Sequence, residues 1–240
     1  MQLTALRSAA YADVSRTPLR GALGDKMTKE DFVNRIRKEY LKARKTLIED
    51  SKIIRGTSHS ISSLSEDIFG KFISDLITND YEIWIDPQIS VKAIRNASGK
   101  RVKTFRPDVC VYAKTKKRIE LIFDLKMDLG YKRKDFIEFS KNRDEELNVI
   151  KENNGTWNRD KVKMEFCFNK DLKWNYIVLS EGNITKEQIE NVKRGFKNNM
   201  DSNLFILSSG EHLNTYNEEN FIINDEAFNS IISIVNQRCG

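Results

Sequence analysis

Residues 106–126 read RPDVCVYAKTKKRIELIFDLK and place ionisable side chains inside two apolar, strand-like runs. Because side chains alternate between the two faces of a strand, Asp124 and Lys126 share one face about 7 Å apart. In the preceding run, Asp108 shares a face with Cys110. If the two runs pair as an antiparallel hairpin through the KTKK turn, Asp108 and Asp124 lie at the same end. The stretch therefore predicts two carboxylates and an ammonium in one small volume.

This charged face allows two interpretations. The first is the solvated face of an ordinary antiparallel sheet. The second is a functional site, because Cys110, Tyr112 and Ile122 are expected on the same face and favour burial, and charges on a covered face need partners, a metal ion or chemistry. The opposite face is expected to be apolar and to consist of Ile119, Leu121, Phe123 and Leu125.

A helix predicted before these strands brings a further carboxylate. Residues 64–77 carry apolar side chains at helical spacing, which places Glu66 at the border of the apolar face and points Asp67 to solvent. Glu66 can therefore reach a sheet on which the helix packs. Alternatively, it is a first-turn acid favoured by the helix dipole.

These groups together suggest a metal-assisted reaction. The carboxylates of Asp108, Asp124 and Glu66, with the carbonyl of Leu125, are hard oxygen ligands suited to Mg²⁺ and poorly suited to zinc. A lysine beside such a metal, here Lys126, can position a water or offset charge that builds on a phosphate. Hydrolysis of a phosphodiester would then need no histidine.

The residues Pro107-Asp108, followed after a gap by Asp124-Leu125-Lys126, resemble the motif of the PD-(D/E)XK nuclease superfamily, to which type II restriction endonucleases belong. The resemblance includes the element order and spans residues 57–210. It implies a restriction-endonuclease-like α/β fold, in which helices flank a mixed β-sheet with an αβββαβ core. It also implies that Asp108 and Asp124 are metal ligands, that Lys126 is the catalytic lysine and that Glu66 is the accessory acid.

The hydrophobic periodicity of the chain predicts the element order α-α-β-β-β-α-β-β-α-β-α in one domain, residues 27–240. The first three strands are expected at 81–94, 101–113 and 118–126, and Trp157 is expected in a polar loop. The other helices are expected at 28–53, 132–152, 185–197 and 225–236. Residues 1–26 differ in composition from the rest, and we interpret them as a non-native or disordered leader, with a native N-terminal arm as the alternative.

Composition limits the partners. The chain of 240 residues has a net charge of +6, which suits a polyanionic partner. No uncharged apolar run approaches the roughly 18 residues of a membrane span, so no membrane is expected as a partner. Three cysteines without a CxxC pair, and only two histidines, form no disulfide framework or zinc cluster and favour the cytoplasm.

Positive charge is concentrated around the hairpin. Residues 92–119 contain ten Lys and Arg and a single acid, Asp108. Such a surface is typical of phosphate contacts, although lysine-rich turns can also be merely solvated. The candidate nucleic-acid contacts are Lys100, Arg101, Lys103, Arg106, Lys114, Lys116, Lys117, Arg118, Lys132, Arg133 and Lys134.

The sequence therefore suggests an endonuclease that cleaves DNA with Mg²⁺ or Mn²⁺. We expect it to act as a homodimer, because cutting two strands is simplest with two sites, and the helix at 28–50 is a candidate interface. The alternatives are a nuclease of the same fold in phage defence, transposition or repair, and a nucleic-acid-binding module without activity.

Overall fold

The computed structural model describes residues 26–45, 52, 59–95, 101–129, 135–182, 184–213 and 221–240, without the side chains of 92–95, 101–103 and 199. These residues form five helices and eleven strands. The helices are α1 (Lys29–Ala43), α2 (Ser62–Ser74), α3 (Phe136–Ile150), α4 (Lys186–Asn199) and α5 (Asp225–Cys239). The strands are β1 (Tyr81–Ile85), β2 (Ile89–Arg95), β3 (Arg101–Phe105), β4 (Val109–Ala113), β5 (Arg118–Lys126), β6 (Gly155–Arg159), β7 (Val162–Phe168), β8 (Trp174–Val178), β9 (Asn203–Ile206), β10 (Ser208–Gly210) and β11 (Phe221–Ile223).

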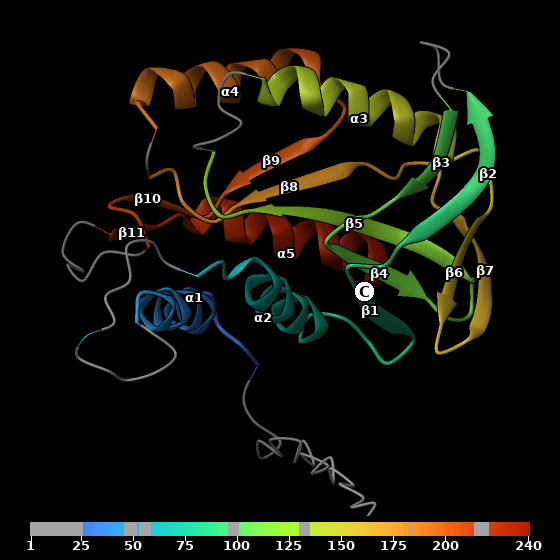
Figure 1. The fold of residues 1–240 in the computed structure, drawn as a ribbon, viewed down its shortest axis with the longest axis horizontal. Coiled ribbons are helices and arrows are strands. Elements are labelled where there is room, and N and C mark those ends of the chain that lie inside the picture. The colour runs from blue at the N-terminus through green and yellow to red at the C-terminus, as the bar shows by residue number, and fades with distance from the viewer. Residues whose placement is uncertain are drawn as a thin grey trace, which may run out of the picture.

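Nine of these strands form one mixed sheet, in the order β1-β4-β5-β7-β6-β2-β3 with β8 and β9 branching from β5. One edge of β5 is divided between two parallel partners. Its first two residues, Arg118 and Ile119, pair with β7, and Ile122 to Lys126 pair with β8. In Figure 1, α3 and α4 lie on one side of the sheet and α1 and α2 on the other. The predicted class, a mixed sheet flanked by helices, is confirmed.

The αβββαβ core consists of α2, the meander β1-β4-β5, the crossover helix α3 and the parallel strand β8. The strands predicted at 81–94 and 101–113 are each divided in two, and the β2-β3 hairpin is inserted between β1 and β4. Both breaks fall at prolines, Pro87 and Pro107, which have no N–H for a ladder bond. At the first break, Asp86 also has a φ of 49°, outside the strand region.

A β-bulge corrects the predicted faces of β5. Val111 faces Leu121 across the hairpin but Tyr112 faces Ile119, so Glu120 is an additional residue in the ladder. Ile119 therefore packs on the side of α3, whereas Leu121 and Phe123 pack on the side of α2. The apolar face expected from Ile119 to Leu125 is not continuous.

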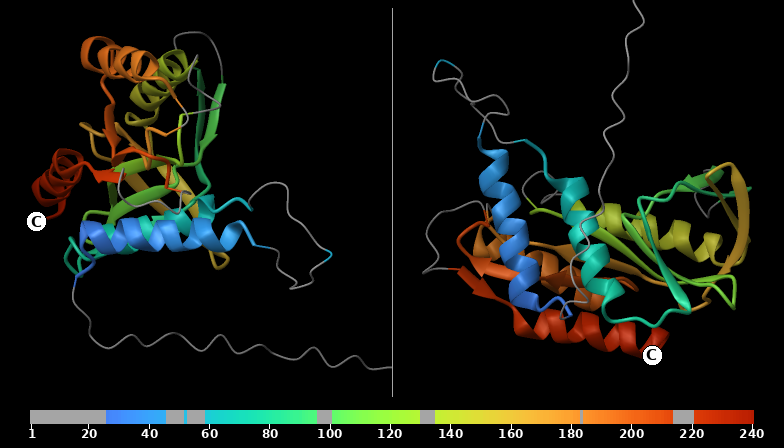
Figure 2. Two further views of the ribbon diagram at one scale, coloured as in Figure 1. Left: turned by 90° about the vertical axis from the view of Figure 1, so that its left-hand side faces the viewer. Right: turned by 90° about the horizontal axis from the view of Figure 1, so that it is seen from below.

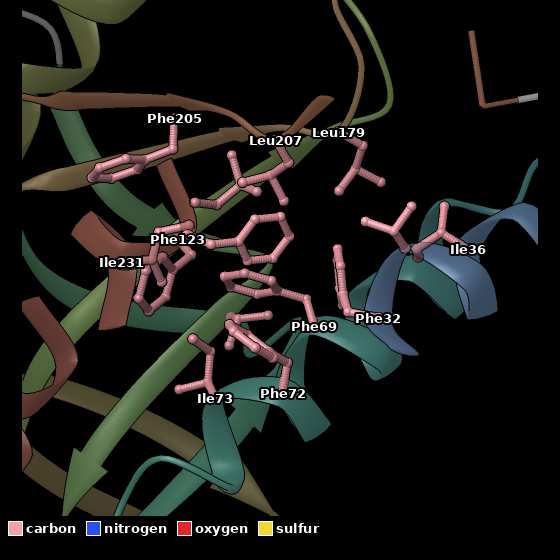
Figure 3. Packing of buried hydrophobic residues seen from close by; sticks show 14 of the residues in the cluster. Phe32, Ile36, Phe69, Phe72, Ile73, Phe123, Leu179, Phe205, Leu207 and Ile231 are labelled. Carbon is pink, nitrogen blue, oxygen red and sulfur yellow. The ribbon is translucent and has the colours of Figure 1, made fainter. Parts of the chain in front are cut away.

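The core between α2 and the sheet is aromatic. Figure 3 shows Phe69 and Phe72 of α2 pointing toward Phe123 of β5, with Phe32 of α1 beside them. The rings of Phe69 and Phe123 meet edge to face with centroids 5.2 Å apart. Each such fully buried side chain contributes about 1.5–3 kcal/mol through removal of apolar surface from water. This packing fixes α2, and with it Glu66, against the sheet.

Some predicted elements differ in length or type. The helix expected over 28–53 ends at Ala43, whose carbonyl accepts a hydrogen bond from the His59 N–H at 2.9 Å. The polar loop expected around Trp157 is the strand β6, which pairs with β7 through a tight turn at Asp160 and Lys161. Both turn residues have positive φ, 49° and 67°, as a two-residue hairpin requires.

Some predictions concern residues that the structure does not describe. Nearly all of the segment interpreted as a leader, residues 1–25, is among them, as is the start of the helix expected at 132–152, which is observed from Phe136. Among the described residues, no helix is long and apolar enough to cross a membrane. Figure 2 shows α1 and α2 side by side beneath the sheet, with α5 at its flank.

Candidate active site

The β4-β5 hairpin places Asp108 and Asp124 opposite one another. Val109 pairs with Phe123 and Cys110 with Ile122, and the Asp108 N–H continues this ladder by donating to the Phe123 carbonyl at 3.1 Å. The Asp86 N–H in turn donates to the Asp108 carbonyl at 2.8 Å. Three chain segments are thus tied together at the end of the hairpin where both acids lie.

Asp124 contacts two cations from two directions. Its side chain is 6% exposed, and its Oδ1 accepts a hydrogen bond from the Lys126 ammonium. Lys126 Nζ also donates to the Leu125 carbonyl at 3.2 Å. The other oxygen of Asp124, Oδ2, lies 3.4 Å from a guanidinium nitrogen of Arg143. The carboxylate is therefore oriented by an ammonium on one side and a guanidinium on the other.

Asp108 is held differently. Its Oδ2 accepts a hydrogen bond of 2.5 Å from the Leu125 N–H. Burial raises the pKa of the Asp108 carboxyl, although Lys126, the Leu125 N–H and Arg143 act in the opposite direction. The protein therefore binds a proton on Asp108 more tightly than the unfolded chain does.

Glu66 enters from α2 and is half-buried, whereas its neighbour Asp67 is exposed, as the helical period predicts. Burial is the largest cause that raises the pKa of Glu66 to about 7, followed by the charges of Asp108 and Asp86. Lys126 lowers this pKa. Glu66 therefore shares the electrostatic environment of the hairpin end, which a first-turn acid facing only solvent would not.

Sequence reasoning missed two charged residues of this site. Asp86 lies in the turn after β1 and forms a bidentate ion pair with Arg106 at 2.5 Å. Arg143 lies on α3 at helical spacing from the buried residues Phe136, Ser140 and Leu147. A charged side chain on the buried face of a predicted helix was the available signal for Arg143. For Asp86, the only signal was its place before a proline.

The donors suit a hard cation, although the set is small. Among the described residues, no group of three His, Cys, Asp or Glu side chains is placed to hold a metal ion. The convergent oxygens are instead those of Asp108, Asp124 and the Leu125 carbonyl. The Lys126 ammonium already contacts two of them, so the site attracts positive charge. Oxygen donors of this kind fit Mg²⁺ or Mn²⁺.

The candidate phosphate contacts are spread over the hairpin. Arg106 lies next to the acids, whereas Lys114, Lys116, Lys117 and Arg118 lie at the opposite end of β4 and β5. Arg118 is six residues before Asp124, about 20 Å along the strand at ~3.3 Å per residue. Lys100, Lys132, Arg133 and Lys134 lie outside the described residues, as do the side chains of Arg101 and Lys103 on β3.

Two of these cations have a partner away from the acids. Arg118 donates to buried Glu120 at 2.7 and 2.9 Å, and Lys116 lies 3.7 Å from the same carboxylate. Glu120 Oε2 also accepts a 2.6 Å hydrogen bond from Asn169. These ion pairs neutralise the carboxylate of Glu120, which is the additional residue at the β-bulge of β5.

One hollow among the described residues lies away from the acids. It has a volume of about 650 Å³ and lies along the edge of β1, between Ser74, Ile83 and Trp157.

Comparisons with known proteins give a distant likeness in structure and none in sequence. No known protein family matches the sequence, and no curated protein does. Among solved structures, the chain is similar to apo NucC of E. coli MS115-1, with 8% sequence identity and a TM-score of 0.41. The alignment covers 89% of this chain and 93% of that one.

Proposed function

We propose that this protein is a metal-dependent endonuclease that hydrolyses phosphodiester bonds of DNA. The observation that supports this proposal is the convergence of Asp108, Asp124, Lys126 and the Leu125 carbonyl at one end of the β4-β5 hairpin, in the arrangement that the PD-(D/E)XK motif implies. Asp108 and Asp124 are the proposed metal ligands, with the Leu125 carbonyl, and Glu66 assists. A bound Mg²⁺ or Mn²⁺ would polarise the phosphate and lower the pKa of a water.

The protein residues have separate tasks in this proposal. Lys126 orients the attacking water and offsets charge on the phosphate, since its ammonium already lies beside Asp124. Glu66, whose pKa is about 7, can take up or release a proton near neutral pH. Arg106, next to the acids, and the remaining candidate cations would contact the phosphate backbone.

Plasmid cleavage tests the proposal. Wild type is expected to cut with Mg²⁺ or Mn²⁺ and not with EDTA, because both carboxylates need a cation between them and the phosphate. Asp108→Asn, Asp124→Asn and Lys126→Ala are each expected to lower the rate by at least about 10²-fold. Lys193→Ala, an exposed lysine on α4, is the matched control and should cut like wild type.

The outcomes separate the alternatives. Failure of wild type to cut DNA with any metal, while it still binds DNA, would favour a binding module without activity. Discrete fragments would indicate a restriction-like enzyme, and a smear would indicate an effector nuclease of the same fold. Light scattering of the protein alone and on a DNA duplex tests the proposed homodimer, which predicts twice the mass of the 27.9 kDa chain.

A further inference from the structure

We propose that Arg143 is a second catalytic cation, which contacts the non-bridging oxygens of the scissile phosphate and does not serve the metal. This inference rests on the proposed nuclease function. It concerns a residue outside the acid-acid-lysine motif, contributed by the crossover helix α3. Three observations support it: how the guanidinium is held, where it faces and how the charges of the site add up.

The guanidinium of Arg143 lies over two aromatic rings. It lies 3.9 Å from the centre of the Trp174 ring and 5.5 Å from that of Phe139. Trp174 is 1% exposed, and its indole N–H donates to the Arg143 carbonyl at 3.3 Å. Trp174 belongs to β8, where it pairs with Ile122 of β5. The same ladder that positions Asp124 therefore also positions the ring beneath Arg143. A lysine ammonium can also lie over a ring, but only the planar guanidinium of arginine can stack parallel to it.

The guanidinium has donor capacity beyond its contact with Asp124. That contact is long, 3.4 Å, and Arg143 Nε is buried without a hydrogen bond of good geometry among the described residues, although the Tyr176 hydroxyl lies close enough to raise the pKa of Arg143. The side chain is nevertheless 22% exposed, and its contact with Asp124 keeps the guanidinium beside the carboxylates. A planar fork with five donors matches two oxygens of a phosphate. Burial lowers the pKa of Arg143, although Tyr176, Glu146 and Asp108 act in the opposite direction.

The charge balance of the site makes the positive charge of Arg143 available to a substrate phosphate once a metal is bound. Lys126 and Arg143 both contact Asp124 and both act to lower the pKa of Asp108, so they offset the charge of the acids when no metal is bound. A divalent cation on the two acids would offset that charge instead and leave Lys126 and Arg143 to balance Glu66 and a bound phosphate. A guanidinium has no lone pair to ligate a metal and repels it. Its excess charge matches the negative charge that develops on a phosphate during hydrolysis.

The test uses Arg143→Met, which keeps much of the side-chain volume without the charge, and Arg143→Lys, which keeps the charge without the fork. In single-turnover cleavage, Arg143→Met is expected to be about 10²-fold slower than wild type, with partial recovery in Arg143→Lys. Mn²⁺ binding to the protein without DNA, measured by calorimetry, is expected to be unchanged or severalfold tighter in Arg143→Met, because a repelling charge is gone. Arg194→Met, an exposed arginine on α4, is the matched control and should change neither quantity.

Two results would overturn the inference. Cleavage by Arg143→Met at the wild-type rate would show that the charge is not used. A parallel loss of Mn²⁺ binding and cleavage would show that Arg143 merely orients Asp124. Near-UV circular dichroism checks that each variant is folded, and Arg143→Lys repeats the test if Arg143→Met is not. If wild type itself does not cut, the proposed function fails, and DNA affinity in Ca²⁺ still tests the phosphate contact, since equal affinity of wild type and Arg143→Met would refute it.

Discussion

The two acids that face each other across the hairpin are expected to affect stability in opposite directions. Asp124 lies between two cations, Lys126 and Arg143, so neutralising it with Asp124→Asn leaves both without their shared anion. Asp108 is a carboxylate whose pKa is raised by burial, so at pH above its pKa the folded protein is penalised for its charge. Asp108→Asn removes that penalty and keeps an oxygen that can accept from the Leu125 N–H.

The size of the Asp124 effect follows from its geometry. At 3.4 Å and an effective dielectric constant of about 20, the ion pair with Arg143 has a Coulomb energy of about 5 kcal/mol. The gain in hydration when the charge of Asp124 is removed offsets part of this energy. Breaking a buried pair by removing one partner typically costs about 3 kcal/mol or slightly more. For a chain of this length that corresponds to a melting temperature lower by about 6–12 °C.

The assay is thermal and urea unfolding of wild type, Asp108→Asn and Asp124→Asn at about pH 8 in EDTA, where Asp108 and Asp124 are ionised in the unfolded chain. Asp124→Asn is expected to lose about 3 kcal/mol with an unchanged urea m-value. Asp108→Asn is expected to be at least as stable as wild type. The reasoning would be refuted by equal losses in the two variants, or by an Asp124→Asn protein as stable as wild type.

Three further predictions concern neighbouring features. Glu66 has a pKa of about 7 against 4.5 for an ordinary glutamate, so the folded protein binds this proton more tightly than the unfolded chain. The stability of wild type therefore falls as the pH rises through this interval. Melting temperatures measured from about pH 4 to 8 should show a smaller fall in Glu66→Gln than in wild type. Phe69→Ala leaves a cavity against Phe123 and should cost about 3–5 kcal/mol in urea unfolding, and an unchanged midpoint would contradict the packing. Glu120→Gln leaves Arg118 without its buried anion and should cost about 2 kcal/mol in urea unfolding, and a variant as stable as wild type would contradict the importance of this pair.

The sequence allowed the class of fold and the convergence of the acids to be predicted, because both follow from local patterns. Strand alternation and a short turn suffice to place Asp108 opposite Asp124. The same antiparallel pairing places the KTKK turn at the end of the hairpin opposite the acids. The lysines of this turn are therefore near the acids in sequence but distant from them in space. The bulge at Glu120 was not predictable from the sequence. An additional residue in a ladder depends on the pairing of the partner strand and, here, on the hydrogen bond from Asn169 to the Glu120 carboxylate.

The remainder of the site depends on packing between distant segments. Arg143 could be assigned to the buried face of α3 by periodicity, but its contact with Asp124 requires that α3 cross back over β5 and β8. The division of the first two predicted strands followed from Pro87 and Pro107, which were readable as breaks. That β1 then pairs with β4 and bypasses the inserted hairpin is a property of the whole sheet.

The parallel pairing of β5 with β8 has a consequence for synthesis of the protein on the ribosome. The guanidinium of Arg143 lies over the ring of Trp174, and Trp174 comes 48 residues after Lys126 in the sequence (174 minus 126). A growing chain that already contains Asp108, Asp124 and Lys126 therefore lacks the strand that completes the site. If the protein cleaves DNA, we expect a chain that ends before β8 to be inactive, because the strand that pairs with β5 beside Asp124 and the ring under Arg143 are both missing.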